Sequence, residues 1–123
     1  MSRRIDAPVA GFYRTRLING GIRVAVRFWF GSPIIDGEEQ DRSPRWCVEV
    51  DGCTDRADYD AEGNYLGRVP LDAHETWPYC EPIDAREYQF LLRRREWAHD
   101  NDPAHPAANP RTPINVRDLK PGW

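Results

Sequence analysis

Residues 12–30, FYRTRLINGGIRVAVRFWF, contain the strongest structural signal in the chain. Two runs rich in aromatic and β-branched residues flank Asn19-Gly20-Gly21, and this arrangement is typical of a β-hairpin. The second run alternates between two sets of residues. Ile22, Val24, Val26, Phe28 and Phe30 form one set, and Arg23, Ala25, Arg27 and Trp29 the other. The alternation predicts a strand with two distinct faces.

The register of this hairpin follows from the side chains that it must bury. A three-residue loop would place Arg16 opposite Val24 and would mix charge into the apolar face. A two-residue loop, formed either by Asn19-Gly20 or by Gly20-Gly21, avoids this mixing, and both choices give the same faces. The predicted core face carries Tyr13, Thr15, Leu17, Val24 and Val26.

The opposite face of the hairpin combines guanidinium groups with aromatic rings. Guanidinium groups clamp phosphates and aromatic rings stack on bases, so this face is a candidate site for a nucleotide or another anionic small molecule. Two further arginines lie in the motif DRSPRW, residues 41–46. The candidate ligand-binding residues are Arg14, Arg16, Arg23, Arg27, Trp29, Arg42 and Arg45, with Phe12 on the same face.

Charge is segregated along the chain. The net charge is −3, but residues 1–30 have a balance of +5 and residues 36–62 a balance of −7. The basic face suits an anionic ligand or self-association. Alternatively, its arginines pair with the acidic segment within the fold or keep an exposed sheet soluble. The sequence leaves these interpretations open.

The length of 123 residues favours one domain, with a β-rich body over residues 1–102 and an extended arm over residues 103–123. No apolar run suits a signal peptide or a membrane span, so we expect a cytosolic protein with no membrane contact. Three cysteines without CxxC spacing indicate reduced thiols.

Further strands are predicted after the hairpin. Residues 45–51, RWCVEVD, alternate and predict a third strand, with Trp46, Val48 and Val50 inward and Cys47 and Glu49 outward. Residues 34–44 suggest a polar loop with a turn at Gly37. Residues 59–69 predict a second hairpin with Gly63-Asn64 between two tyrosines, and residues 71–82 an aromatic connector that covers the core.

One helix is predicted from Asp84 to about His99. Asp84 and Glu87 have the spacing of a capping box. One face of this helix, expected to cover an open side of the sheet, carries Tyr88, Leu91, Leu92 and Ala98.

Phe90 and Trp97 lie on the opposite face of the predicted helix and need a second partner. The candidates are the tail from Pro103 to Trp123, which its prolines make extended, or another subunit. We therefore expect an α+β fold: a three- to five-stranded antiparallel sheet, open or curled into an SH3-like barrel, one helix and an extended Pro-rich arm.

Motifs for catalysis and metal binding are incomplete. Residues 58–63, DYDAEG, imitate half of a calcium loop, but Val69 stands where a bidentate glutamate is needed. The cysteines and His74 match no closed zinc pattern, and no lysine follows Glu49 and Asp51 at a nuclease-like spacing. GxSxG, GxxxxGK[ST] and GxGxxG are lacking. We expect no catalytic activity, no metal and no cofactor.

Several motifs, taken together, are more specific than any of these patterns. They are GFYRTRL at 11–17, Gly20-Gly21, VAVRFW at 24–29, DRSPRW at 41–46, WPYC at 77–80, PID at 82–84, Glu87-Tyr88 and NPRTPI at 109–114. In this combination the chain resembles a group of short uncharacterised proteins encoded by tailed phages and proteobacterial prophages. The resemblance covers most of the chain, DRSPRW is its most specific part, and residues 55–69 are longer here than in the group.

The resemblance implies a phage setting and no particular reaction. Small phage accessory proteins without enzymatic motifs are often antagonists of host defence. We therefore expect a non-enzymatic anti-defence protein in the host cytosol, a homo-oligomer that sequesters a nucleotide signal or binds a host defence protein. The alternatives are a structural or assembly protein of the virion and a nucleic-acid-binding accessory protein. The net negative charge and the single lysine, Lys120, disfavour nucleic acid.

Overall fold

The predicted hairpin forms the middle of the main sheet. In the computed structural model, which describes residues 8–41 and 43–111, β1 (Gly11–Arg16) pairs with β2 (Arg23–Gly31). Arg16 lies opposite Arg23, which is the register of a two-residue loop at Asn19-Gly20. The Gly21 amide donates to the Ile18 carbonyl at 3.1 Å and closes this loop. The predicted two-residue loop is confirmed, and of the two possible loops the protein uses Asn19-Gly20.

Two more strands complete an open antiparallel sheet. β5 (Arg45–Val50) pairs with β2, as predicted, and β8 (Glu81–Pro82) pairs with β1, giving the order β5-β2-β1-β8. β8 was not predicted, because two edge residues carry no periodic pattern. The α+β class is confirmed, and the sheet is open rather than closed into a barrel.

One face of the sheet carries an aromatic core. The rings of Tyr13, Phe28 and Trp77 meet edge to face, with centroids 5.1 to 5.4 Å apart. Trp77 begins the 3-10 turn η1 (Trp77–Tyr79), which follows the short helix α1 (Ala73–Thr76). The predicted connector therefore supplies the centre of the core as well as its cover, since Trp77 is 1% exposed.

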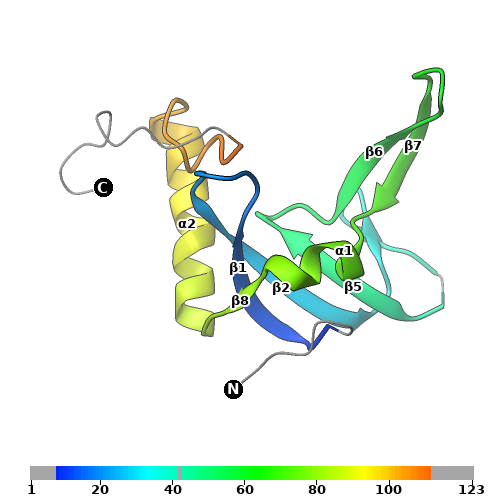
Figure 1. Cartoon of the computed structure of the whole chain (residues 1–123), viewed down its shortest axis with the longest axis horizontal. Helices are drawn as coiled ribbons and strands as arrows, with labels where there is room; N and C mark the ends of the chain where they lie inside the picture. The colour runs from blue at the N-terminus through cyan, green and yellow to red at the C-terminus, as the bar shows by residue number, and fades with distance from the viewer. Residues whose placement is uncertain (1–7, 42, 112–123) are drawn as a thin grey trace.

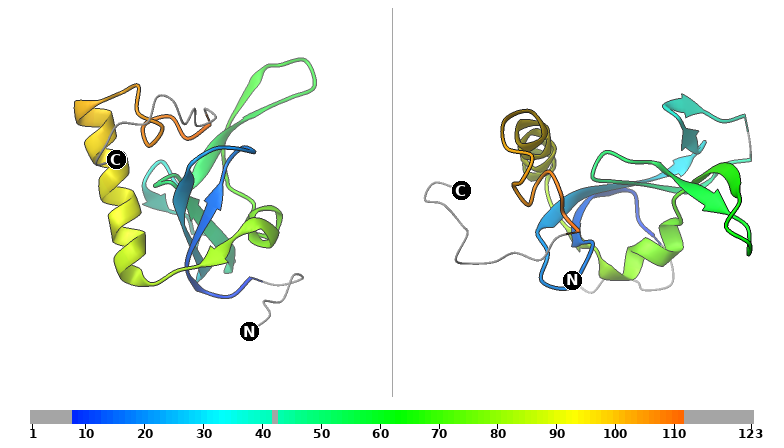
Figure 2. Two further views of the ribbon diagram at one scale, coloured as in Figure 1. Left: turned by 60° about the vertical axis from the view of Figure 1, so that its left-hand side comes forward. Right: turned by 90° about the horizontal axis from the view of Figure 1, so that it is seen from above.

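The other face of the sheet is covered by α2 (Ala85–Asn101). The Asp84 carboxylate accepts from the Glu87 amide at 2.8 Å, so the predicted helix start is confirmed, and the helix runs two residues past His99. Tyr88 and Leu91 pack with the buried Ala25 of β2. α1 and α2 thus lie on opposite sides of the sheet (Figure 2).

The burial of one residue of β5 differs from the prediction. Cys47 was expected to point outward, but it is buried. It lies opposite Trp29, and its thiol donates to the Gly31 and Arg45 carbonyls. Burial raises the pKa of the Cys47 thiol. The alternation of residues along a strand identifies its two faces, but it does not show whether either face is exposed to solvent.

Residues 34–39 have more regular structure than the predicted polar loop. They contain a small ribbon of β3 (Ile34–Ile35) and β4 (Glu38–Glu39). Asp36 and Gly37 both have positive φ, 54° and 79°, as a two-residue hairpin turn requires. The turn predicted at Gly37 is confirmed, and the strands beside it were missed because each is only two residues long.

The second predicted hairpin is confirmed as β6 (Asp55–Tyr59) and β7 (Tyr65–Pro70). This ribbon projects from the body of the protein, beyond the main sheet (Figure 1). Asp55 lies opposite Pro70, so the two ends of the ribbon meet at its base. Neither strand pairs with another strand in the described part of the chain.

The beginning of the predicted extended arm is folded instead. From residue 103 to 111 the chain forms successive turns, and Ala107 is buried against Ile22, Val24 and Ala98. Proline excludes helix and sheet ladders but is compatible with turns, so the extended conformation was not the only one available. The rest of the arm, residues 112–123, lies outside the described residues.

Candidate functional site

The arginine face predicted from the hairpin lies against α2, and most of its charges are paired. The Arg14 guanidinium contacts Glu87 at 3.1 Å and Glu81 at 3.2 Å. Arg23 contacts the other Glu81 oxygen at 3.2 Å. Glu81 and Glu87 lie outside the acidic segment 36–62, so these partners were not predicted from the charge pattern. These pairs reduce the positive charge that the face offers to an anion.

Arg27 and Trp29 are adjacent, as the candidate site required. The Arg27 guanidinium lies 4.8 Å from the Trp29 ring centroid, within the range of a cation–π interaction. However, Arg27 also faces Glu49, with 3.7 Å between nitrogen and oxygen. This pair involves the acidic segment, as the second interpretation of the charge pattern expected.

Glu49 is also the partner of a helix residue. The Tyr88 hydroxyl donates to the Glu49 carboxylate beneath α2. Burial and this carboxylate both raise the pKa of the Tyr88 phenol, while Arg27 opposes them. The three groups join β2, β5 and α2 and hold the helix on the sheet. Glu49 therefore accepts a hydrogen bond from Tyr88 and forms an ion pair with Arg27.

Two arginines of α2 bind the loop ends of the sheet. An Arg94 nitrogen donates to the Arg23 carbonyl at 2.7 Å, and Arg95 lies 3.4 Å from Asp51. Burial raises the pKa of Asp51 even though Arg95 and its neighbours act in the opposite direction. We interpret this cluster as structural, because its groups are half-buried between the helix and the sheet.

Arg16 does not lie beside α2 with Arg14, Arg23 and Arg27. It lines a cleft at the base of the ribbon. The cleft has a volume of about 820 Å³ and lies between the end of β1, the base of β6–β7, α1 and residues 109–111. Arg16 and Arg111 are exposed in it, and Tyr79 is 76% exposed. Among the described residues, no carboxylate forms an ion pair with Arg16. The cleft also contains acidic residues, so its charge is mixed.

Arg45 lies in a separate, smaller cleft. This cleft has a volume of about 420 Å³, and Arg45, Trp46, Arg56 and His74 lie along it. Arg42 lies outside the described residues. The described residues of the predicted site are therefore divided between the α2 side of the sheet, the cleft with Arg16 and the cleft with Arg45. The structure does not bring them together on one surface.

The ribbon β6–β7 presents apolar side chains to solvent. Tyr59, Tyr65 and Leu66 are 59, 60 and 61% exposed, and the two tyrosine rings meet at 5.9 Å. The sequence offered one signal for this exposure. β6 and β7 lack the strict apolar alternation of β2, so the ribbon has no face built to be buried.

The turn of the ribbon is held by its own side chains. The Asp60 carboxylate accepts from the Glu62 and Asn64 amides at 3.0 and 2.8 Å and from the Asn64 side chain at 3.2 Å. This carboxylate, which occupies a ligand position in the calcium-like motif, is therefore directed to the turn. In the described part of the chain, no three metal-ligating side chains of His, Cys, Asp or Glu come together.

The base of the ribbon is anchored by one carboxylate. Asp55 accepts from Arg68 at 2.8 Å and from the backbone amide of Asp36 at 2.8 Å. The hydrogen bond from Arg68, followed by that from Asp36, lowers the pKa of Asp55. These bonds tie β6, β7 and the β3–β4 turn together. The ribbon is therefore presented in a defined direction.

Comparison of the chain with protein-family models, with curated proteins and with solved structures found no match. Within residues 8–41 and 43–111, none of the helices has the length and apolar character that crossing a bilayer requires.

Proposed function

We propose that this chain is a phage-encoded, non-enzymatic antagonist of bacterial defence that acts by binding a host defence protein with its β6–β7 ribbon. The observation that carries the proposal is the exposed group of Tyr59, Tyr65 and Leu66 on a projecting hairpin. Large aromatic side chains with few rotatable bonds are frequent anchors of protein interfaces. The phage setting and the host cytosol come from the sequence resemblance.

The charge of the ribbon indicates the kind of surface that it fits. Asp58 precedes Tyr59 in the chain, and Asp60 and Glu62 lie between Tyr59 and Tyr65, so the tip of the ribbon has an excess of acidic residues. A partner with apolar pockets surrounded by basic residues would be complementary in shape and charge. Within residues 8–41 and 43–111, no other strand pairs with either edge of the ribbon, so a strand of the partner could extend it.

Preorganisation supports the same function. The Asp60 turn and the Asp55 anchor fix the two ends of the ribbon before any partner arrives. Binding then has a smaller entropic cost than it would for a loop that orders on contact. An exposed aromatic group on a rigid support is therefore suited to tight docking.

The test expresses the protein in bacterial strains that each carry one defence system and measures phage plating. We expect wild-type protein to restore plaque formation in at least one strain. The double variant Tyr59→Ser/Leu66→Ser should lose this effect while keeping its circular dichroism spectrum. Phe30→Ser, which removes an equally exposed aromatic ring outside both the ribbon and the cleft that Arg16 lines, is the matched control. If the ribbon variant restored plaque formation as well as the wild type does, the proposal would be contradicted.

A second candidate function rests on the cleft that Arg16 lines. Its volume of about 820 Å³ suits a nucleotide, with Arg16 and Arg111 available for phosphate and Tyr79 for stacking. Native mass spectrometry with a panel of cyclic and ADP-ribose-derived nucleotides distinguishes the two functions. A stoichiometric mass shift that Arg16→Ala abolishes and Tyr59→Ser retains would favour nucleotide sequestration.

A further inference from the structure

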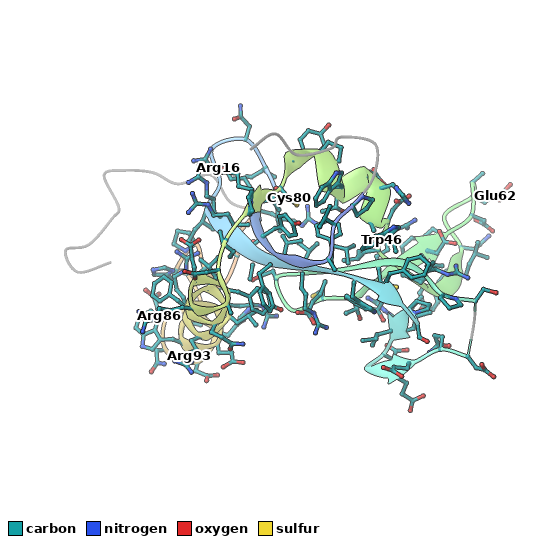
Figure 3. All side chains as sticks on the ribbon, turned by 90° about the horizontal axis from the view of Figure 1, so that it is seen from below. Arg16, Trp46, Glu62, Cys80, Arg86 and Arg93 are labelled. Atoms are coloured by element: carbon teal, nitrogen blue, oxygen red, sulfur yellow. The ribbon has the colours of Figure 1, made fainter. Side chains whose placement is uncertain are left out.

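The solvent-facing side of α2 carries a regular stripe of cations and aromatic rings. Arg86, Phe90, Arg93 and Trp97 follow one another at spacings of four, three and four residues and lie within a sector of about 60° around the helix. Phe90 is 59% exposed and Trp97 52% exposed. Arg86 and Arg93 point away from the sheet (Figure 3). We call these four residues the α2 stripe.

Contacts with the described residues cover only part of the two rings. Arg94 lies 5.9 Å from the Phe90 ring centroid. His105 meets the Trp97 ring edge to face at 5.8 Å, with an interplanar angle of 85°. Both rings nevertheless remain more than half exposed. A large apolar area on a surface helix favours a second partner.

The order of residues in the α2 stripe makes it complementary to itself. The spacing is the same when it is read in either direction, while cations and aromatic rings exchange places. A second α2 packed antiparallel therefore sets Arg86 against the partner's Trp97, and Phe90 against the partner's Arg93. Both contacts occur twice about a two-fold axis, as in an isologous interface. Each is a cation–π pair between subunits.

Asp100 adds an ion pair at each end of the same arrangement. It is exposed one helical turn beyond Trp97, so in an antiparallel pair it approaches Arg86 of the other copy. A parallel pair would instead oppose Arg86 to Arg86 and Arg93 to Arg93, which is unfavourable. The charges therefore select the antiparallel orientation.

We propose that α2 is the interface of a two-fold symmetric dimer of this chain, formed by antiparallel packing of two α2 stripes. The occupant of this face is thus a second copy of the protein. The interface leaves the β6–β7 ribbon of each subunit free, because Glu62 at the ribbon turn lies at the end of the molecule remote from Arg86 and Arg93 (Figure 3). The dimer would present two ribbons, and two linked binding elements increase avidity for a multimeric partner.

The test is sedimentation velocity of the full-length protein across a concentration series. We expect a reversible monomer–dimer equilibrium for the wild type. Arg86→Asp should raise the dimer dissociation constant by about tenfold or more. The new carboxylate would face Asp100 of the other copy, and the cation–π pair with Trp97 of the other copy would be lost. The double variant Arg86→Asp/Asp100→Arg restores the ion pair with the charges exchanged, and it should recover part of the dimer.

Two further variants separate the interface from folding and from the ribbon. Phe90→Ser should weaken the dimer without lowering stability, because the ring is exposed, and Tyr79→Ser should leave it unchanged. A monomeric wild type would overturn the proposal. So would a dimer that survives both Arg86→Asp and Phe90→Ser, whatever its response to Tyr59→Ser/Leu66→Ser. Loss of defence antagonism in the ribbon variant with retention of the dimer keeps the two proposals distinct.

Discussion

The two hairpins of this protein have similar turn signals but different surroundings. β1–β2 lies between the aromatic core on one side and α2 on the other, and Val26 is fully buried. β6–β7 stands outside the body and exposes Tyr59, Tyr65 and Leu66. The comparison shows that turn residues determine where a hairpin forms, whereas the apolar pattern of its strands determines whether the fold buries it.

The largest difference should appear when aromatic rings are removed from the two regions. Trp77→Ala takes the central ring from the β1–β2 core and should lower the free energy of unfolding by about 3–5 kcal/mol. Urea denaturation measures this loss. Tyr79→Ser, two residues later but exposed, should change the value by less than about 0.5 kcal/mol. Similar losses for the two variants would contradict the assigned core.

A smaller effect is expected at the contact that holds α2 on the β1–β2 side. Tyr88→Phe removes the hydrogen bond to Glu49 and should cost about 2 kcal/mol, because the carboxylate loses a buried donor. The native state also raises the pKa of the phenol, so it keeps a proton that the unfolded chain releases above a pH of about 10. The free energy of unfolding of the wild type should therefore fall as the pH rises above this value.

The alkaline dependence provides its own check. Tyr88→Phe cannot titrate, so its stability should fall less steeply above pH 10 than that of the wild type. Tyr65→Phe, which removes an exposed hydroxyl on the ribbon, is the matched control. If Tyr65→Phe flattened the alkaline profile as much as Tyr88→Phe, the assignment to Tyr88 would be wrong.

The base of the ribbon should respond locally. Asp55→Asn weakens the bonds from Arg68 and from the Asp36 amide, and amide exchange in β6 and β7 should accelerate on the order of fivefold, with β1 and β2 unchanged. These bonds lower the pKa of Asp55, so their stabilisation is present above the ordinary carboxyl pKa of 3.8 and is lost as the pH falls through the folded value. Glu62→Gln at the tip is the control. Faster exchange throughout the main sheet would show that the ribbon is not an independent unit.

The smallest effect on stability is expected at the ribbon tip. Tyr65→Ser removes a ring that is 60% exposed and should change the free energy of unfolding by no more than about 0.5 kcal/mol. Thermal unfolding of this variant beside Trp77→Ala measures the contrast directly. A loss of several kcal/mol at Tyr65 would mean that the ring is buried against another part of the protein.

Local signals in the sequence predicted a large part of this fold. The hairpin faces, the third strand, the Asp84 cap and the second hairpin all depend on residues close to one another in the chain, and all are confirmed. The burial of Cys47 and the turns at residues 103–111 depend on which elements meet in space. Periodicity carries no information about such meetings.

The candidate site was less predictable for the same reason. The alternation of side chains and the two-residue loop predicted the face on which Arg14 and Arg23 lie. Their partners, Glu81 and Glu87, are more than fifty residues away in the chain. Whether an arginine is available for a ligand depends on such distant carboxylates. Arg16 lines a cleft, unlike Arg14 and Arg23, because it is the last residue of β1 and lies beside the cleft at the base of the ribbon.

The pairing of Asp55 with Pro70 has a consequence for how the protein can vary. Because both ends of the ribbon meet at its base, residues between them can be exchanged, added or removed with little displacement of the main sheet. The ribbon can therefore acquire a new specificity by changes that the core does not oppose. A protein built in this way separates the part that must fold from the part that must adapt.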